Sequence, residues 1–460
     1  MRLTILGGGG FRVPLVHRAL LADSVRADAP VTEIVLFDDD AQRLAAIGAV
    51  LDRQRDAHRA VHGEPPLTVR AESDLDAALR GCDIVFCAIR VGGMAGRVLD
   101  ERVALDAGVL GQETVGAGGI SYGLRTLPVA IGVAHAVRRL APDAWVVNFT
   151  NPAGLVTEAM ARVLGDRVVG ICDSPVGLGR RAARALGLDP ARVHVDYAGL
   201  NHLGWLRGLH AGGRDRLPDL LADERALTSF EEGRLFGAEW LRALGSLPNE
   251  YLHYYYMAHE SHEAVARSAR DGGSTRGEQL VDQQRDFYPA AAAHPETAYA
   301  LWDRTRLERE ETYMAANRSA AGGVEREEAD LDGGGYEQVA LAVMRAIALD
   351  EPTRLIVNVR NRGALGGLDS EAVVEVPCLV DSSGARPLAV DALTPHQDAL
   401  VRTVKSVDRE VLDAVATGSR TAALRAFATH PLVGSVGTAR TLLEGYLRAF
   451  PRLGDVLHRS

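Results

Sequence analysis

Two clusters of polar side chains have the residue types to bind a divalent metal ion. Cys172 and Asp173 follow a short apolar run at residues 168–171, which is typical of a buried parallel strand. His202 lies further along, in a polar cluster at residues 199–205. Ligands of open α/β sheets bind at the carboxyl ends of strands, and thiolate and imidazole both bind divalent metals. The pattern alone also allows Cys172 to be a buried, small apolar residue.

A glycine-rich loop near the N-terminus could bind a dinucleotide. Four glycines at positions 7–10, Gly7 and Gly9 among them, separate a predicted strand from a predicted helix. Glycines there let the backbone approach a pyrophosphate, and the helix N-terminus supplies free N–H groups. Asp38 ends the second predicted strand, where its carboxylate could accept from ribose hydroxyls and would repel a 2′-phosphate, which favours NAD over NADP. The alternative is a structural turn followed by a helix N-cap.

The elements that must position these residues alternate between strand and helix patterns. Short β-rich runs at residues 3–6, 33–37, 84–88, 145–148 and 168–171 are separated by helical stretches at 12–22, 41–60 and 127–140. This order predicts an α/β fold with a doubly wound sheet. From about 217 to 321 the pattern is helical, and a helix–strand pair, paired strands at 371–390 and further helices follow. We therefore predict a nucleotide-binding domain at 1–200 and a mostly helical α+β domain at 201–460.

Composition excludes several classes of protein. The chain has 460 residues, of which 47% are hydrophobic and 24% charged, as in an ordinary globular protein. Its net charge of −10 argues against a nucleic-acid partner, which would require a basic face. No apolar run approaches the roughly 20 residues of a membrane span, so no membrane association is expected. Four cysteines make no disulfide framework, and a cytoplasmic location is predicted.

Two motif-like segments are poor candidates for catalysis. Gly119-Ile120-Ser121-Tyr122-Gly123 matches the pattern of a serine nucleophile, but the residues before it contain two glycines and are not a strand. His259 and His262 are three residues apart, which is not the spacing of a zinc-protease helix. We expect neither segment to be catalytic.

A series of motifs resembles one enzyme family nearly from end to end. The matching segments are the glycine loop, Ile89-Arg90-Val91-Gly92-Gly93, Gly111-Gln112-Glu113-Thr114-Val115-Gly116, residues 148–152, Cys172-Asp173, residues 199–205, Pro248-Asn249-Glu250-Tyr251-Leu252-His253-Tyr254-Tyr255, Thr275-Arg276-Gly277 and His430-Pro431-Leu432-Val433. In this order they resemble the family 4 glycoside hydrolases, the NAD-dependent group that includes 6-phospho-β-glucosidases and 6-phospho-α-glucosidases. The resemblance implies a Rossmann-like domain joined to an α+β domain that carries the interface of a homodimer or homotetramer.

The resemblance also implies roles for single residues. Cys172 and His202 would bind a divalent metal, usually manganese, and Gly7, Gly9 and Asp38 would form the NAD site. The remaining implied residues are the catalytic Tyr251, the proton donor Asp173, and the substrate-binding Arg97, Asn151 and Arg276.

The implied reaction replaces the usual carboxylate pair of glycosidases by redox-assisted elimination. NAD oxidises C3 of the sugar, Tyr251 removes the C2 proton, the aglycone leaves, water adds and NADH re-reduces C3. Asn201-His202-Leu203 resembles β-acting members, whereas Asp173 resembles α-acting ones, and we expect 6-phospho-β-glucosides as substrates. The alternatives are a 6-phospho-α-glucosidase, a galactosidase or glucuronidase of the same family, and an NAD-dependent dehydrogenase.

Overall fold

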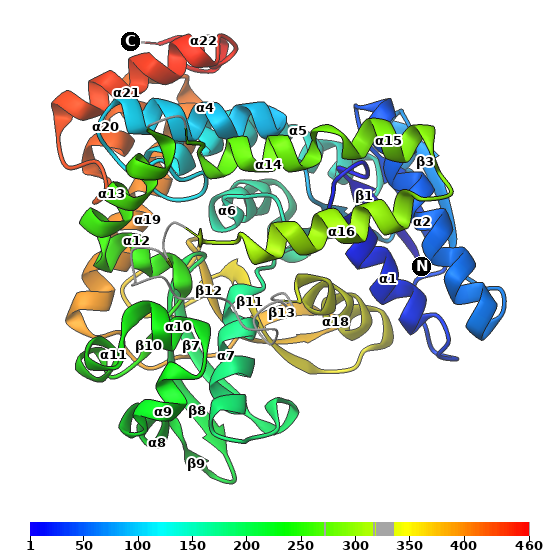
Figure 1. Ribbon diagram of the computed structural model, residues 1–460, viewed down its shortest axis with the longest axis horizontal. Helices are drawn as coiled ribbons and strands as arrows, with labels where there is room; N and C mark the ends of the chain where they lie inside the picture. The colour runs from blue at the N-terminus through cyan, green and yellow to red at the C-terminus, as the bar shows by residue number, and fades with distance from the viewer. Residues whose placement is uncertain (271–272, 316–317, 319–334, 460) are drawn as a thin grey trace.

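Figure 1 shows the whole chain, which is built around one large mixed sheet. The first six strands of this sheet are parallel. The computed structural model describes residues 1–270, 273–315, 318 and 335–459. The parallel strands are β1 (Arg2–Leu6), β2 (Glu33–Phe37), β3 (Thr68–Glu72), β4 (Ile84–Cys87), β5 (Trp145–Asn148) and β6 (Val168–Gly170). Their order is β3-β2-β1-β4-β5-β6, the doubly wound order of dinucleotide-binding folds. The strand order reverses between β1 and β4, which creates a crevice at their carboxyl ends.

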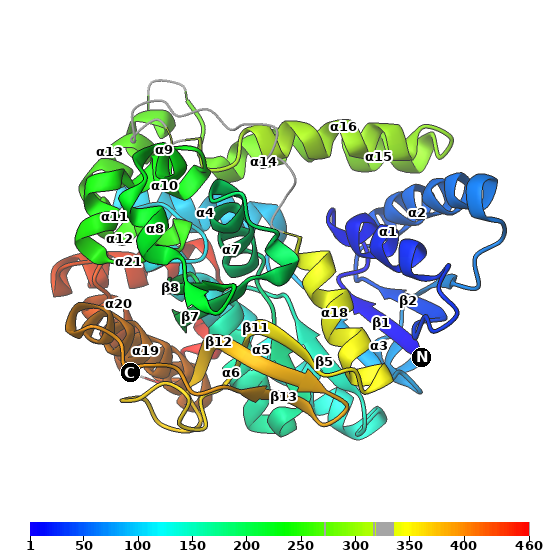
Figure 2. The same ribbon diagram turned by 90° about the horizontal axis from the view of Figure 1, so that it is seen from below.

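Helices cover both faces of this parallel sheet (Figure 2). Leu3 and Ile5 of β1 belong to a core that includes residues of α1 and α2, whereas Leu6 belongs to a second core with residues of α5 and α6. Successive side chains of a strand point to opposite faces, so two cores require strands that are apolar throughout. The helices of this half are α1 (Val13–Asp23), α2 (Ala41–His62), α3 (Leu75–Leu79), α4 (Gly93–Asp106), α5 (Gly116–Leu140), α6 (Ala153–Leu164) and α7 (Ser174–Ala185).

The second half of the chain extends the same sheet with antiparallel strands. The sheet continues from β6 in the order β11-β12-β7-β8-β10, with β13 paired to β12 and β9 to β8. These strands are β7 (His194–Leu200), β8 (Leu203–Ala211), β9 (Arg214–Asp215), β10 (Leu247–Pro248), β11 (Thr353–Arg360), β12 (Val373–Asp381) and β13 (Gly384–Pro387). The predicted domain boundary at residue 200 falls at the end of β7, inside this continuous sheet.

The remaining helices surround the antiparallel part and return to the first half. They are α8 (Leu217–Ala222), α9 (Glu224–Thr228), α10 (Glu231–Phe236), α11 (Ala238–Leu244), α12 (His253–Tyr256), α13 (Ala258–Ala269), α14 (Arg276–Arg285), α15 (Phe287–Ala293), α16 (Ala298–Glu311), α18 (Tyr336–Leu349), α19 (Pro395–Thr417), α20 (Arg420–Thr429), α21 (Val436–Ala449) and α22 (Leu453–Val456). Helices α15 and α16 pack against α2, and Trp302 Nε1 donates to the carbonyl oxygen of Phe11 at 2.8 Å (Figure 1). The α/β fold with an α+β second half confirms the predicted class, although residues 316–317 and 319–321 of the predicted helical stretch lie outside the described residues.

Helix α5 differs from its prediction in two ways. It begins at Gly116 and not at 127, because Gly118 and Gly119 lie against the backbone oxygens of Gln112 and Thr114, where a Cβ would clash. Ser121 is therefore fully buried inside a helix, which agrees with its exclusion as a nucleophile. The helix is also long and apolar enough to cross a membrane, contrary to the expectation from sequence. However, 67% of its most apolar window is buried inside the protein, as in a core helix.

Candidate active site

The predicted site residues gather around one cleft at the carboxyl ends of the parallel strands. The cleft has a volume of about 980 Å³. Nine of the ten predicted residues line it, namely Gly7, Asp38, Arg97, Asn151, Cys172, Asp173, His202, Tyr251 and Arg276. Gly9 is the exception, because its N–H donates to the Asp38 carboxylate at 2.8 Å. Residues that are distant in sequence are thus brought to a single crevice at the switch point of the sheet.

The glycine loop forms one end of the cleft and has the close packing that a dinucleotide requires. Gly7 has φ +84°, and a Cβ there would lie 2.5 Å from the carbonyl oxygen of Ala88, so no other residue fits without strain. Asp38 lies at the end of β2, and burial raises the pKa of its carboxyl. Tyr288 of α15 covers the loop and donates to the Gly9 carbonyl oxygen at 3.2 Å. A backbone cradle beside an acidic strand end therefore fits the pyrophosphate and ribose of NAD.

The two predicted metal ligands both line the cleft. Cys172 follows β6, and His202 lies in the tight turn between β7 and β8 with φ +61°. Burial lowers the pKa of His202 to about 3, so its imidazole is neutral, the form that binds metals. Among the described residues no group of three or more His, Cys, Asp and Glu side chains could hold a metal ion. The donor set of one sulfur and one nitrogen fits a metal whose other positions are filled by substrate or water.

Tyr251 lies beside the proposed metal ligands. Its backbone N–H donates to Oδ1 of Asn249 at 3.0 Å, which fixes the short 3₁₀ turn Glu250–Leu252. Its ring stacks on the imidazole of His202, and its hydroxyl accepts a hydrogen bond from the Tyr313 hydroxyl at 3.2 Å. Burial and the neighbouring Glu250 raise the pKa of Tyr251 well above its ordinary value. The phenol is therefore protonated in this environment at neutral pH.

Asp173 has the position of a helix cap but not its hydrogen bond. It is the N-cap residue of α7, yet its side chain makes no capping bond, which argues against the purely structural alternative. Its carboxylate lies 4.0 Å from a guanidinium nitrogen of Arg12. Burial alone would lower the pKa of Arg12, but Glu310 and Asp173 raise it. Asp173 is thus a partly exposed carboxylate of the cleft wall that could approach a ligand.

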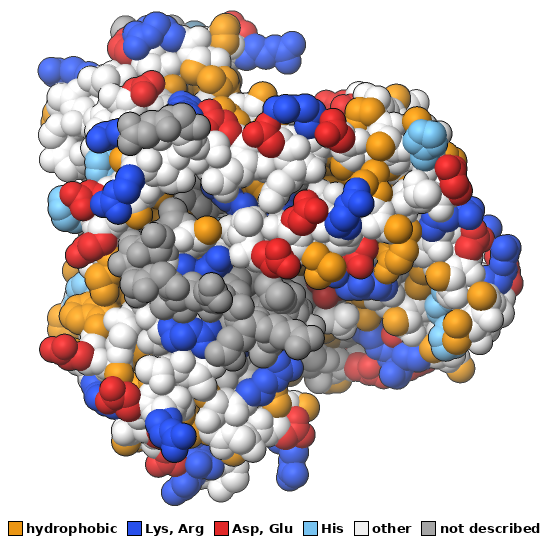
Figure 3. Space-filling view, viewed as in Figure 1, with side chains coloured by type: hydrophobic (Ala, Val, Ile, Leu, Met, Phe, Trp, Pro, Cys, Tyr) orange, Lys and Arg blue, Asp and Glu red, His pale blue; other side chains and the backbone are white. Residues whose placement is uncertain are grey.

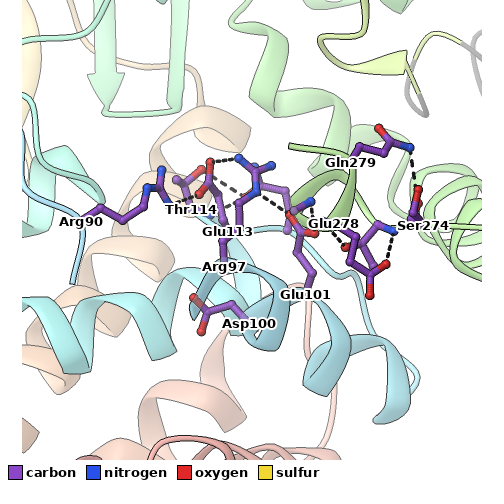
Figure 4. A network of polar contacts seen from close by, with 12 residues as sticks. Arg90, Arg97, Asp100, Glu101, Glu113, Thr114, Ser274, Glu278 and Gln279 are labelled. Carbon is purple, nitrogen blue, oxygen red and sulfur yellow. Dashed lines mark hydrogen bonds and ion pairs between the residues drawn. The ribbon is translucent and has the colours of Figure 1, made fainter. Parts of the chain in front are cut away.

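Arg97 is held by carboxylates of the protein itself (Figure 4). Its Nε donates to Glu101 at 2.8 Å and another nitrogen donates to Glu113 at 2.6 Å, while Arg90 also pairs with Glu113. Glu101 additionally accepts from the backbone N–H of Gly277 at 2.7 Å. Burial would raise the pKa of Glu113, but Arg90 and Arg97 lower it to about 2. Arg97 is therefore already neutralised, and this network connects α4 to the start of α14.

Two other arginines of the cleft lack such compensation. Arg276 donates only to neutral oxygens, namely Thr312 Oγ1 at 2.7 Å and the Arg309 carbonyl oxygen at 2.9 Å. Arg309 makes no side-chain hydrogen bond or ion pair with the part of the chain that the structure describes, and its guanidinium lies 5.8 Å from the Phe11 ring centroid. Burial, together with a neighbouring arginine, lowers the pKa of Arg276 to about 10 and that of Arg309 to about 9.

Sequence reasoning did not identify several residues of the cleft. Glu113 lies within a motif that matched, but nothing in the local pattern indicates that it pairs with Arg90 and Arg97. Arg309 belongs to the last turn of α16 and Tyr313 follows the end of that helix, and neither carries a motif. Asn151 was identified, and its Oδ1 is buried without a hydrogen-bond partner in the described structure, as expected for an atom that meets a ligand.

Comparisons with known proteins agree with this geometry. A probable 6-phospho-beta-glucosidase of Bacillus subtilis is 30% identical to the chain, covering 98% of it and 96% of the relative. A 6-phospho-alpha-glucosidase from gut microorganisms, solved in complex with NAD and Mn²⁺, superimposes with a TM-score of 0.81 at 26% identity over 98% of each chain. The 6-phospho-beta glucosidase of Thermotoga maritima, solved with NAD and glucose-6-phosphate, has the same TM-score and identity over 98% of this chain and 99% of that one.

Family models match both halves of the chain. Residues 2–188 match the family 4 glycosyl hydrolase model, and residues 197–433 match the model of the C-terminal domain of that family. Together these segments cover most of the sequence, including every predicted site residue. The chain belongs to the family 4 glycosyl hydrolases.

Proposed function

We propose that this protein hydrolyses 6-phosphoglucosides, and the β-anomers in particular, with NAD and a divalent metal, Mn²⁺, as cofactors. One observation carries the proposal. A single cleft holds the glycine loop, the Cys172/His202 pair, Tyr251, and Arg276 and Arg309, neither of which pairs with a carboxylate of the described residues. Relatives and solved neighbours described as phosphoglucosidases, with NAD, Mn²⁺ and glucose-6-phosphate in their structures, support the same substrate and cofactors.

The side chains of the cleft suit the elimination chemistry. When bound, NAD would accept and return a hydride at C3, and the metal would act as a Lewis acid on the adjacent oxygens. Tyr251 would act as the base in its phenolate form, which a bound metal and the hydrogen bond from Tyr313 would stabilise, and it becomes the neutral phenol when it takes the C2 proton. Asp173 protonates the leaving oxygen, and Asn151 accepts a hydrogen bond from a sugar hydroxyl through its buried Oδ1. No pair of flanking carboxylates is required.

The anomeric preference rests on the turn that carries His202. The Asn201-His202-Leu203 sequence resembles β-acting members, and this turn supplies the predicted metal ligand whose ring stacks on the predicted base. Asp173 favours the α-anomer as the second candidate, because it resembles α-acting members and its carboxylate is free of a capping bond. The relatives include enzymes of both kinds.

Four nitrophenyl glucosides would test the proposal. The α- and β-forms, each with and without a 6-phosphate, are assayed with NAD, Mn²⁺ and a thiol reductant. We expect the 6-phospho-β form to have the highest kcat/KM, without net formation of NADH. A preference for the α-phosphoglucoside would overturn the proposed anomeric preference, and equal rates with and without phosphate would overturn the phosphate requirement. Steady accumulation of NADH would instead indicate a dehydrogenase.

A further inference from the structure

The cleft contains two classes of arginine that differ in their partners. Arg90 and Arg97 both pair with Glu113, so their charges are compensated within the protein. Arg276 and Arg309 have no carboxylate within ion-pair distance among the described residues. The difference in partners does not follow from burial, because Arg97 is more buried than Arg276 and Arg309. It follows from which side chains surround each guanidinium.

Arg276 and Arg309 are tied to each other through the end of α16. Arg276 gives one donor to the carbonyl oxygen of Arg309 and another to Thr312, so its guanidinium also caps the last turn of that helix. Cations stabilise a helix C-terminus, which gives Arg276 a structural role in addition to any role in binding. The nitrogens of Arg309, in contrast, make no hydrogen bond to the described chain. All the donors of the Arg309 guanidinium are therefore unused within the described chain.

The surroundings of Arg309 make its charge unfavourable in the absence of a ligand. Burial and the positive charges of Arg12 and Arg276 lower its pKa to about 9, and Glu310 opposes this only in part. Its packing on the Phe11 ring, at 5.8 Å, is near the limit of a useful cation–π contact. A desolvated cation without a partner destabilises the folded protein, and such groups are retained where a ligand compensates them.

We propose that Arg309 binds a phosphoryl group in this cleft, with Arg276 as its neighbour. The planar guanidinium fork matches the spacing of two phosphoryl oxygens and can bind them bidentately. The inference rests on the proposed function, because both the 6-phosphate of the substrate and the pyrophosphate of NAD would carry such oxygens. Arg12, at the end of the glycine loop, and Arg276, at the start of α14, are the two cations that most affect the charge of Arg309, so either phosphate could reach it.

The role assigned to Arg97 changes accordingly. Sequence resemblance assigned Arg97 and Arg276 to the substrate, but two nitrogens of Arg97 already donate to Glu101 and Glu113. A phosphate that displaced Glu101 would leave that buried acid without an ion-pair partner, and one that displaced Glu113 would leave it with Arg90 alone. Arg97 is better described as the residue that holds Glu101 against the backbone of Gly277, which places Arg276 at the edge of the cleft.

The test compares Arg309→Met with two control variants. Arg309→Lys keeps the charge but loses the fork, and Arg304→Met removes an exposed arginine from the same helix. Dissociation constants of glucose 6-phosphate, glucose and NAD are measured by calorimetry, with Mn²⁺ present. If the wild-type protein binds glucose 6-phosphate and NAD, unchanged affinities in the variants count against the role of Arg309 alone; if the wild type binds neither ligand, the proposed function itself fails.

The proposal predicts a selective loss of phosphate binding. We expect Arg309→Met to lower the affinity for glucose 6-phosphate or for NAD at least tenfold, and Arg309→Lys to lower it less. The affinity for glucose should not change in any variant, and Arg304→Met should bind all three ligands as the wild type does. If only the affinity for glucose 6-phosphate falls, Arg309 binds the phosphate of the substrate. If only the affinity for NAD falls, Arg309 binds the pyrophosphate of the dinucleotide. Unchanged affinities for both ligands in a folded Arg309→Met protein would overturn the proposal.

Stability provides a second measurement that keeps the test decisive. Because the free protein holds Arg309 without a compensating charge, Arg309→Met should unfold at the same or a higher temperature than the wild type. Inorganic phosphate should raise the melting temperature of the wild type more than that of Arg309→Met. A large loss of stability in the variant would show that Arg309 is structural, and would also overturn the proposal.

Discussion

The imidazole of His202 lies flat against the phenol ring of Tyr251, with ring centroids 3.6 Å apart and an interplanar angle of 5°. This contact joins the turn between β7 and β8 to the 3₁₀ turn Glu250–Leu252. Because the two rings are stacked, the orientation of the predicted metal ligand and that of the predicted base depend on each other. Disturbing either ring should therefore affect the other.

The first prediction separates the hydroxyl of Tyr251 from its ring. Tyr251→Phe keeps the stacking partner of His202, so Mn²⁺ affinity should be retained while kcat falls by about 10²–10⁴. Tyr251→Ala removes the partner and should weaken Mn²⁺ binding as well. Manganese titration followed by electron paramagnetic resonance, together with steady-state kinetics, measures both effects. Equal Mn²⁺ affinities in the Phe and Ala variants would contradict the coupling.

The second prediction concerns removal of the metal and its sulfur ligand. Chelation should abolish turnover, and added Mn²⁺ should restore it. In Cys172→Ser the metal loses a thiolate donor, so restoration should require a much higher Mn²⁺ concentration. Since Cys172 is buried and free, peroxide should inactivate the enzyme slowly, and thiol should reverse the inactivation if oxidation stops at a sulfenic acid. Cys172→Ser protein that binds and uses Mn²⁺ normally would count against the assignment.

The third prediction addresses the choice of dinucleotide. In Asp38→Asn the single carbonyl oxygen should still accept the hydrogen bond from the Gly9 N–H, which keeps the shape of the glycine loop, while the bond that the other oxygen accepts from the Asp40 N–H is lost. Loss of the carboxylate should lower the affinity for NAD by about tenfold, because the charge-assisted hydrogen bond to the ribose becomes a neutral one. Repulsion of a 2′-phosphate should also decrease, which narrows the preference for NAD over NADP. Fluorescence titration with both dinucleotides gives the ratio, and an unchanged ratio would refute this role of Asp38.

The fourth prediction is a pH dependence of stability that arises from Glu113. Its pKa is lowered in the folded state to about 2. A carboxyl with a depressed pKa stabilises the fold above its unfolded pKa of about 4.3, and this contribution is lost as the pH falls toward 2. The free energy of unfolding of the wild type should therefore exceed that of Glu113→Gln by the most above pH about 5, on the order of 3 kcal/mol.

Urea unfolding at a series of pH values from 3 to 7 would measure this difference. The gap between wild type and Glu113→Gln should shrink as the pH is lowered. Glu72→Gln, in a surface pair with Arg70, is a suitable control and should change stability little at any pH. A gap that stayed constant or widened in acid would contradict the ion-pair arrangement of Glu113.

The strands and the order of the first half could be predicted because the relevant signals are local. Runs such as residues 33–37 and 145–148 are apolar throughout, and the structure has strands with those same bounds. Helix α5 was predicted too short, since glycines near residue 118 are unusual in a helix and read as a loop. They are tolerated because the helix approaches the backbone of Gln112 and Thr114 too closely for any side chain.

The candidate site was predicted as a set of residues but not as a geometry. Motifs located Cys172, His202 and Tyr251, and the cleft includes all three. Sequence could not reveal that the imidazole and phenol rings stack, because the contact joins two turns on different parts of the chain. Nor could it reveal that Arg97 is neutralised by Glu113 while Arg309 is not. Such pairings depend on long-range packing and not on local pattern.

Charge is mixed over the outside of the molecule, in contrast with the cleft. On the face seen in Figure 3, side chains of Lys and Arg lie among those of Asp and Glu. Exposed pairs of this kind contribute little to stability individually. Arg276 and Arg309 therefore differ from the ordinary surface arginines, because no carboxylate of the described residues pairs with them.

The continuous sheet has a consequence for any attempt to divide the chain. Strand β6 is joined to β11 at the pair Gly170 and Asn358, and β11 comes from the last third of the sequence. A fragment that ended at residue 200 would leave one side of β6 with bare N–H and C=O groups. Unprotected edges of this kind recruit other chains and aggregate. The ribosome must therefore release nearly the whole polypeptide before the central sheet can close, and excised halves should be insoluble unless they are expressed together.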